Sequence, residues 1–120
     1  MNPFAVSDTV FISKRPQDMR AGIQRLASVV TLDFERDPMD GGLYVFISRD
    51  AKKAKMLTFD MNGWCLYYCT LCEGTFKWVH ASAAKDPLLT IERRQLIWLL
   101  EGLSMNQPKA AKPVTARNIL

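Results

Sequence analysis

The sequence predicts an α+β domain in which two helices pack on an antiparallel meander sheet of four to five strands, in the order β-α-β-β-β-β-α. The first observation is that apolar residues recur with helical spacing near both ends of the chain, whereas they alternate with period two across its middle. The second is that the links between the period-two runs are short and rich in turn-forming residues, which favours antiparallel neighbours. The third is size, because 120 residues with 48% apolar and 23% charged side chains suit one folded domain.

The first strand and the first helix are expected in the opening third of the chain. Residues 9–13 (TVFIS) are a β-branched and aromatic run typical of a strand, and Pro16 then has the fixed φ that suits a helix start. Gly22 falls inside this helix, where it costs about 1 kcal/mol relative to Ala, so we expect another backbone to approach closely there. The acidic segment 33–42, which contains proline and two glycines, is predicted to be a loop. The apolar stripe of the helix consists of Met19, Ile23, Leu26, Ala27, Val30 and Phe34.

Four period-two runs follow, and each is predicted to be a strand. They are residues 43–48 (LYVFIS), 55–59 (KMLTF), 64–69 (WCLYYC) and 75–79 (TFKWV). Because the first run is apolar on both faces, we expect it to lie centrally in the sheet with the first helix covering one side.

A second helix is expected from Ile91 to Glu101, with Thr90 as its N-cap and Gly102 at its end. Its apolar stripe consists of Leu96, Leu99, Leu100 and Leu103. The last sixteen residues contain two prolines and three positive charges without a regular apolar period. We therefore expect one domain over residues 1–104 and a mobile basic tail over residues 105–120.

The residue types present exclude most familiar catalytic chemistries. His80 is the only histidine, and the G-x-S-x-G, H-E-x-x-H and P-loop patterns are absent. No spacing pairs two carboxylates as an acid and a base, so we expect neither enzymatic activity nor a cofactor. The chain has no long apolar run and no leader-like start, which predicts a cytoplasmic protein without a membrane partner.

Two basic groups are candidates for contacting phosphates. The chain has 16 Lys and Arg against 12 Asp and Glu, and this net charge of +4 permits a nucleic-acid partner. Both groups also have a simpler interpretation, as solvated charges that keep a hairpin tip or a helix face soluble. The hairpin group consists of Arg49, Lys52, Lys53 and Lys55. The group beside the first helix consists of Lys14, Arg15, Arg20 and Arg25, of which the first three are expected to contact phosphates.

The only metal candidate is a Cys3His set formed by Cys65, Cys69, Cys72 and His80. Structural zinc sites usually draw their ligands from two separate knuckles, whereas these four residues would lie in one strand and its hairpin. Cys65 and Cys69 should share one face of their strand. The alternative, that these cysteines are reduced thiols without a metal, is the one we expect.

Four sequence blocks resemble a known family. They are P-Q-D-M-R-A-G (16–22), D-P-M-D-G-G-L-Y-V-F (37–46), K-x-L-x-F-D-x-N-G-W-C-L-Y-Y (55–68) and G-T-F-K-W (74–78). Over roughly residues 9 to 104, their order and spacing closely resemble the TnpB-type accessory proteins of the insertion-sequence-sixty-six family of bacterial transposons. These are distinct from the RNA-guided nucleases that share the name TnpB. The D-M-R-x-G motif of the family falls on Asp18, Met19, Arg20 and Gly22.

The resemblance implies a small protein that is encoded beside a larger transposase, supports efficient transposition and has no established catalytic residues. We therefore expect a non-catalytic accessory protein of insertion-sequence DNA transposition, which contacts the phosphates of transposon ends through the basic hairpin and the helix start. The alternative is an adaptor that binds the transposase or another transposon protein without touching DNA. The sequence leaves the oligomeric state open.

Overall fold

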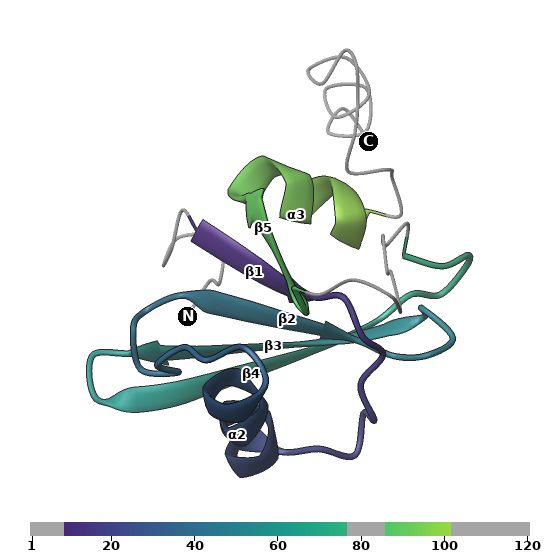
Figure 1. Ribbon diagram of the computed structural model, residues 1–120. Coiled ribbons are helices and arrows are strands. Elements are labelled where there is room, and N and C mark those ends of the chain that lie inside the picture. The colour runs from purple at the N-terminus through teal and green to yellow at the C-terminus, as the bar shows by residue number, and fades with distance from the viewer. Residues whose placement is uncertain (1–8, 77–85, 102–120) are drawn as a thin grey trace.

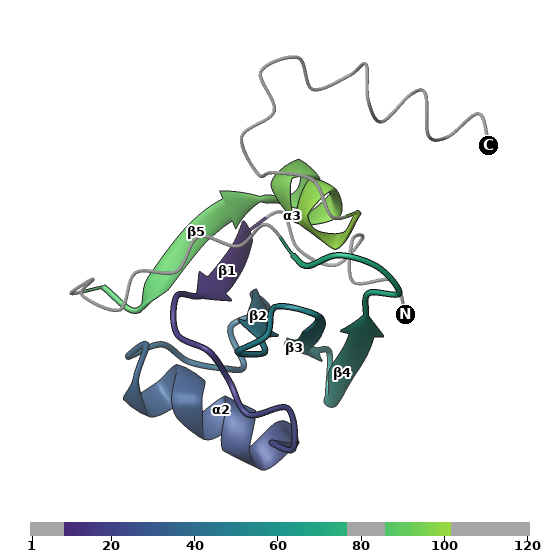
Figure 2. The same ribbon diagram turned by 90° about the vertical axis from the view of Figure 1, so that its right-hand side faces the viewer.

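The computed structural model describes residues 9–76 and 86–101, and these residues form a five-stranded sheet between two helices (Figure 1, Figure 2). Helix α2 covers one face of the sheet and helix α3 covers the other. In chain order the elements are β1 (Thr9–Ser13), α2 (Ile23–Leu32), β2 (Leu43–Ile47), β3 (Lys53–Asp60), β4 (Gly63–Thr70), β5 (Leu88–Glu92) and α3 (Arg93–Leu100).

The sheet is mixed. Its strand order is β4-β3-β2-β1-β5, in which β1 and β2 run parallel and every other neighbouring pair runs antiparallel. The predicted α+β class is confirmed, but the purely antiparallel meander is wrong. The reason is that α2 connects β1 to β2 and returns the chain to the end of the sheet where β1 began, so that β2 repeats the direction of β1.

The fifth strand lies further along the chain than predicted. In the run 75–79, Thr75 and Phe76 belong to no strand, and the other three residues lie outside the described ranges. Strand β5 instead pairs antiparallel with β1, with Thr90 opposite Phe11. Thr90 and Ile91 are therefore strand residues and not the start of the second helix, because Ile91 fills the core beneath α3.

A capping box starts helix α3 directly after β5. Glu92 is the N-cap, its side chain accepts a hydrogen bond from the backbone of Gln95, and its own N–H donates to the Gln95 side chain at 2.8 Å. The predicted N-cap, Thr90, is thus two residues too early. Gly102 and the expected tail at residues 105–120 lie outside the described residues.

Helix α2 begins seven residues after Pro16, later than expected. Gly22 is its N-cap with an extended backbone, so the prediction of a glycine inside the helix is wrong. A Cβ at Gly22 would meet no atom within 4 Å, which also removes the expected close approach of another backbone. The local reason is that Asp18 accepts a hydrogen bond from the Arg20 N–H at 2.9 Å and turns the chain before the helix starts.

Within the described ranges, no helix is long and apolar enough to cross a membrane.

Strand β2 is the centre of the core, since all five of its residues are buried. Alternate side chains enter opposite clusters: Leu43, Val45 and Ile47 face α3, whereas Tyr44 and Phe46 face α2. The helix residues that meet them include Leu96 and Leu99 from α3 and Leu26 and Val30 from α2. The expectation that this strand is central and covered by the first helix is confirmed.

The capping box gives a stability prediction. Glu92→Ala should lower the free energy of unfolding by about 1 kcal/mol, because it leaves an amide of the first turn of α3 without its acceptor. Arg94 forms an exposed ion pair with Glu92 at 2.9 Å, so Arg94→Ala should change the free energy of unfolding by less than about 0.5 kcal/mol. Urea unfolding followed by circular dichroism measures both. Equal losses in the two variants would show that the ion pair, and not the cap, stabilises this end.

Candidate functional site

Three loops gather at one end of the sheet (Figure 1): the segment 14–22, the β2–β3 turn 48–52 and the segment 71–76. The first loop is tied to the sheet by the N–H of Gln17, which donates to the carbonyl of Ile47 at 2.9 Å. The third is tied to the second by the N–H of Phe76, which donates to the carbonyl of Ala51 at 2.6 Å. Segments far apart in sequence, including both predicted basic groups, are thereby brought together.

Two hollows at this end join cations from different loops. Arg20 and Arg25 line a hollow of about 660 Å³ together with Gln17 and Asp18. Arg49, from the β2–β3 turn, lines a second hollow of about 260 Å³ with the same Gln17 and Asp18. Because the two hollows share a wall, the three guanidinium groups lie around one part of the surface. Arg25 was not among the residues predicted to contact phosphates, although it lies in the same stretch of sequence.

Lys52 and Lys53 extend this surface along the hairpin, and both are exposed. Lys53 lies on the α2 side of the sheet, because alternate residues of β3 share a face and Leu57 packs against α2. Arg15 is exposed, whereas Lys14 is half-buried and its N–H donates to Pro87 at 2.8 Å, beside β5. The basic surface, as we use the term below, consists of Arg20, Arg25, Arg49, Lys52 and Lys53.

Lys55 does not belong to the basic surface, because it is buried. Its Nζ donates to the carbonyl of Ala21 at 2.8 Å and lies 5.2 Å from the centre of the Tyr68 ring. The ammonium group therefore ties β3 to the residue just before the α2 N-cap. This side chain positions the helix start and is not available to a phosphate.

The residues of the D-M-R-x-G motif have different roles: some stabilise the fold, and others lie at the surface. Asp18 holds the exposed Arg20 side chain with contacts of 3.1 Å and 2.7 Å to Nε and Nη2, and these bonds lower the pKa of Asp18 to about 2. Met19 packs at the edge of the α2-side core cluster, and Gly22 caps the helix. Arg20 is the more exposed partner of this ion pair, with 92% of its side chain exposed against 53% for Asp18.

The acid in the hairpin is also engaged in the fold. The Ser48 hydroxyl donates to Asp50 at 2.6 Å and lowers the pKa of that carboxyl, and the N–H of Lys52 donates to the same oxygen at 3.1 Å. Asp50 therefore shapes the turn that carries Arg49, Lys52 and Lys53. It offsets one of their charges, although among the described residues it forms no ion pair with them.

The cysteines lie on and just beyond strand β4. Cys65 and Cys69 share one face, as expected, and Cys72 is exposed in the loop that follows. Among the residues that the structure describes, no three Cys, His, Asp or Glu side chains converge as metal ligands. The fourth candidate, His80, lies outside those residues.

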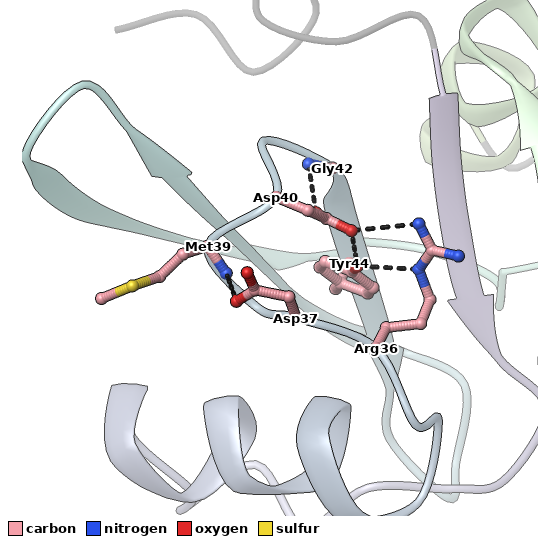
Figure 3. Close-up of polar contacts among 6 residues, drawn as sticks. All are labelled: Arg36, Asp37, Met39, Asp40, Gly42 and Tyr44. Atoms are coloured by element: carbon pink, nitrogen blue, oxygen red, sulfur yellow. Dashed lines mark hydrogen bonds and ion pairs between the residues drawn. The ribbon is translucent and has the colours of Figure 1, made fainter.

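A second polar cluster, which sequence reasoning did not find, closes the opposite end of the sheet (Figure 3). Tyr44 donates its hydroxyl proton to Asp40 at 2.8 Å and accepts a hydrogen bond from Arg36 Nε at 3.0 Å. Arg36 Nη2 also meets Asp40 at 3.0 Å, and its guanidinium lies 4.1 Å above the centre of the Phe11 ring. The sequence signal was the spacing of Arg36, Asp40 and Tyr44 by four residues each, but these residues span a loop and a strand, where that spacing implies no fixed geometry.

This cluster is built to hold the loop before β2. Asp40 accepts a further hydrogen bond from the Gly42 N–H at 2.8 Å, and a Cβ at Gly42 would lie 3.0 Å from both Asp40 and Phe11. Burial is the main cause that raises the pKa of Tyr44 to about 12, so the phenol stays neutral and acts as a donor. The Tyr44 hydroxyl is a neutral donor, and its two partners, Arg36 and Asp40, are also paired with each other. This arrangement suits a structural clamp and not a catalytic base.

The raised pKa of Tyr44 predicts a loss of stability at high pH. Because the unfolded phenol loses its proton near pH 10 and the folded one near 12, the free energy of unfolding should fall as the pH rises from about 10 to 12. Tyr44→Phe should be less stable near pH 8 and should lose less stability over the alkaline range. Urea unfolding at both ends of the range measures the difference. Parallel curves for the two proteins would refute this role of the hydroxyl.

Comparison with known proteins agrees with the resemblance of the sequence blocks. The profile of the family described as IS66 Orf2 like protein matches residues 8–110. A relative from Sinorhizobium fredii, named "Uncharacterized protein y4hO", is 32% identical over 109 residues, which cover 91% of this chain and 92% of the relative. No solved structure matches the chain. The chain therefore belongs to the IS66 Orf2-like family, the TnpB-type accessory proteins of that insertion sequence.

Proposed function

We propose that this protein is a non-catalytic accessory factor of insertion-sequence transposition that binds DNA through the basic surface. The observation that carries the proposal is the convergence of cations from separate segments: Arg20, before α2, and Arg25, in its first turn, line one hollow, and Arg49 of the β2–β3 turn lines the hollow beside it. Family membership supports the role in transposition. The alternative is that these charged side chains only keep the hairpin and the helix face soluble. That role does not require the three guanidinium groups to lie around two adjoining hollows.

Binding through this surface would act on the DNA backbone. Its side chains stand on two loops, the first turn of α2 and the start of β3, and guanidinium groups match phosphate oxygens in charge and in geometry. Contacts of this kind carry little sequence information, so affinity should depend strongly on salt and weakly on sequence. The nearby acids offset part of this charge: Asp18 is ion-paired with Arg20 at 2.7 Å, Asp33 lines the larger hollow, and Asp50 accepts a hydrogen bond from the Ser48 hydroxyl.

The adaptor is the second candidate, and the other end of the sheet favours it. The loop 33–42 and the β3–β4 turn lie there, and Met61 in that turn is 91% exposed. Leu32, in the last turn of α2, is 75% exposed. A contiguous exposed apolar patch is typical of a contact with another protein, so the adaptor requires Leu32 and Met61 to belong to such a patch. The two candidates differ in whether the purified protein binds DNA by itself.

Fluorescence anisotropy with a labelled duplex of the element's terminal repeat and a scrambled duplex tests the proposal. Arg49→Gln should weaken binding to both duplexes and reduce the slope of log affinity against log salt by about 1. Arg94→Gln removes the same charge from α3 on the far face of the sheet, and it should leave the slope unchanged. Removing Arg49, Lys52 and Lys53 together should abolish binding at low salt. Lys55 is excluded from these variants because it is buried.

Two outcomes would contradict the proposal. Equal weakening by Arg49→Gln and Arg94→Gln would mean that net charge, and not this surface, drives binding. No binding to either duplex at low salt would leave the adaptor as the function of the fold.

A further inference from the structure

The outer edge of β4 lacks the protection that the other sheet edge has. Strand β4 forms one edge of the sheet, and its eight residues (GWCLYYCT) contain neither a charge nor a proline. At the opposite edge, β5 has five residues, follows Pro87 and ends in Glu92. Natural edge strands are usually kept short, charged or interrupted by proline, because an unpaired edge recruits another strand. By this measure β5 is protected, and among the residues that the structure describes no strand pairs with the outer side of β4.

The hydrogen-bond phase of the β3–β4 ladder decides which residues face that edge. Asp60 pairs with Gly63 across a two-residue turn, and at the other end of the ladder the Leu71 N–H donates to the Lys52 carbonyl at 2.8 Å. Both observations direct the backbone groups of the odd-numbered β4 residues toward β3. The even-numbered residues therefore direct their N–H and C=O groups outward. These are Trp64, Leu66, Tyr68 and Thr70.

We propose that β4 pairs with β4 of a second copy of this chain, antiparallel, about a two-fold axis through Tyr67. In this register Leu66 lies opposite Tyr68, and Trp64 lies opposite Thr70. Every outward residue of both strands then belongs to a hydrogen-bonded pair. Moving the axis by half a residue along the strand would set outward residues against inward ones, and moving it by one whole residue would leave one outward residue of each strand beyond the partner strand.

The charge distribution favours a second copy as the occupant. Two copies of a protein with a net charge of +4 repel each other, so a contact between them requires a part of the surface without charge. The basic surface lies at one end of the sheet and not on β4. The uncharged β4 sets no like charges opposite one another. Trp64 and Leu66 are half-buried at the α2-side cluster, and Tyr67 and Cys69 at the α3-side cluster, so pairing would extend both cores across the axis. The same surface patch serves both copies, as two-fold symmetry requires. This inference does not rest on DNA binding.

The register places Cys65 of each copy opposite Cys69 of the other. Because both are odd-numbered, they form non-hydrogen-bonded pairs, whose Cα atoms lie about 4.5 Å apart. That distance is within the range that a disulfide spans. Cys65 and Cys69 also point to the same face of the sheet. The dimer therefore contains two symmetry-related pairs of thiols that an oxidant can join.

Oxidation with diamide tests both the pairing and its register. The background is Cys72→Ser, which removes the exposed thiol of the following loop. Diamide takes two electrons and two protons from each pair of thiols and leaves one S–S bond. We expect a covalent dimer on non-reducing gels, with Cys65 joined to Cys69 in mass spectra. In the same background, Cys65→Ser alone and Cys69→Ser alone should each give no covalent dimer. A mixture of the two variants should form one joined by a single bond.

Sedimentation of the reduced protein gives the second readout, because it does not depend on the thiols. We expect a reversible dimer whose population rises with concentration and is unchanged by Cys72→Ser. Thr70→Pro removes an outward N–H and should shift the protein to monomer. A protein that stays monomeric over the accessible concentrations would overturn the proposal. So would a dimer in which Cys65 joins Cys65, or one that is retained after Thr70→Pro, since either would place the interface elsewhere.

Discussion

Burial of β2 on both faces is the constraint on which the rest of the structure depends. A strand whose five side chains are all buried requires an apolar layer above it and another below it. Helices α2 and α3 supply those layers on opposite sides, and each buried side chain of this size contributes about 1.5–3 kcal/mol. With both faces of the central strands covered, most charged side chains lie on the loops at the two ends of the sheet and on the outer faces of the helices, and the buried Lys55 is held by the carbonyl of Ala21.

The chemistry at the basic end follows from how the loops there are anchored. The N–H of Gln17 bonds to the end of β2, and the buried ammonium of Lys55 bonds to the carbonyl of Ala21. These contacts hold the segment before α2 against the β2–β3 turn, so that Arg20 and Arg49 lie around adjoining hollows. At the other end, the clamp of Arg36, Asp40 and Tyr44 holds the loop that enters β2. Each end is thus positioned by the same central strand.

Local patterns predicted the elements of this fold well and their long-range pairing poorly. Alternation identified β2, β3 and β4. The direction of β1 relative to β2 was missed, although the helix expected between these two strands is the connection typical of a parallel pair. Pro16 and Asp18 suit a turn as well as a helix start, which explains the misplaced start of α2. Both basic groups could be located from the sequence, although the burial of Lys55 could not. Its period-two alignment with Leu57 and Phe59 was the available signal, because that alignment places Lys55 on the face that α2 covers.

The central claim is that one end of the sheet, together with the first turn of α2, meets DNA. Backbone amide NMR spectra recorded during titration with a short duplex test it most directly. The account predicts salt-sensitive shift changes that cluster at Asp18–Arg25 and Arg49–Lys53, with β2, β5 and α3 unchanged. Shift changes that centre on α3 or β5 would contradict the account.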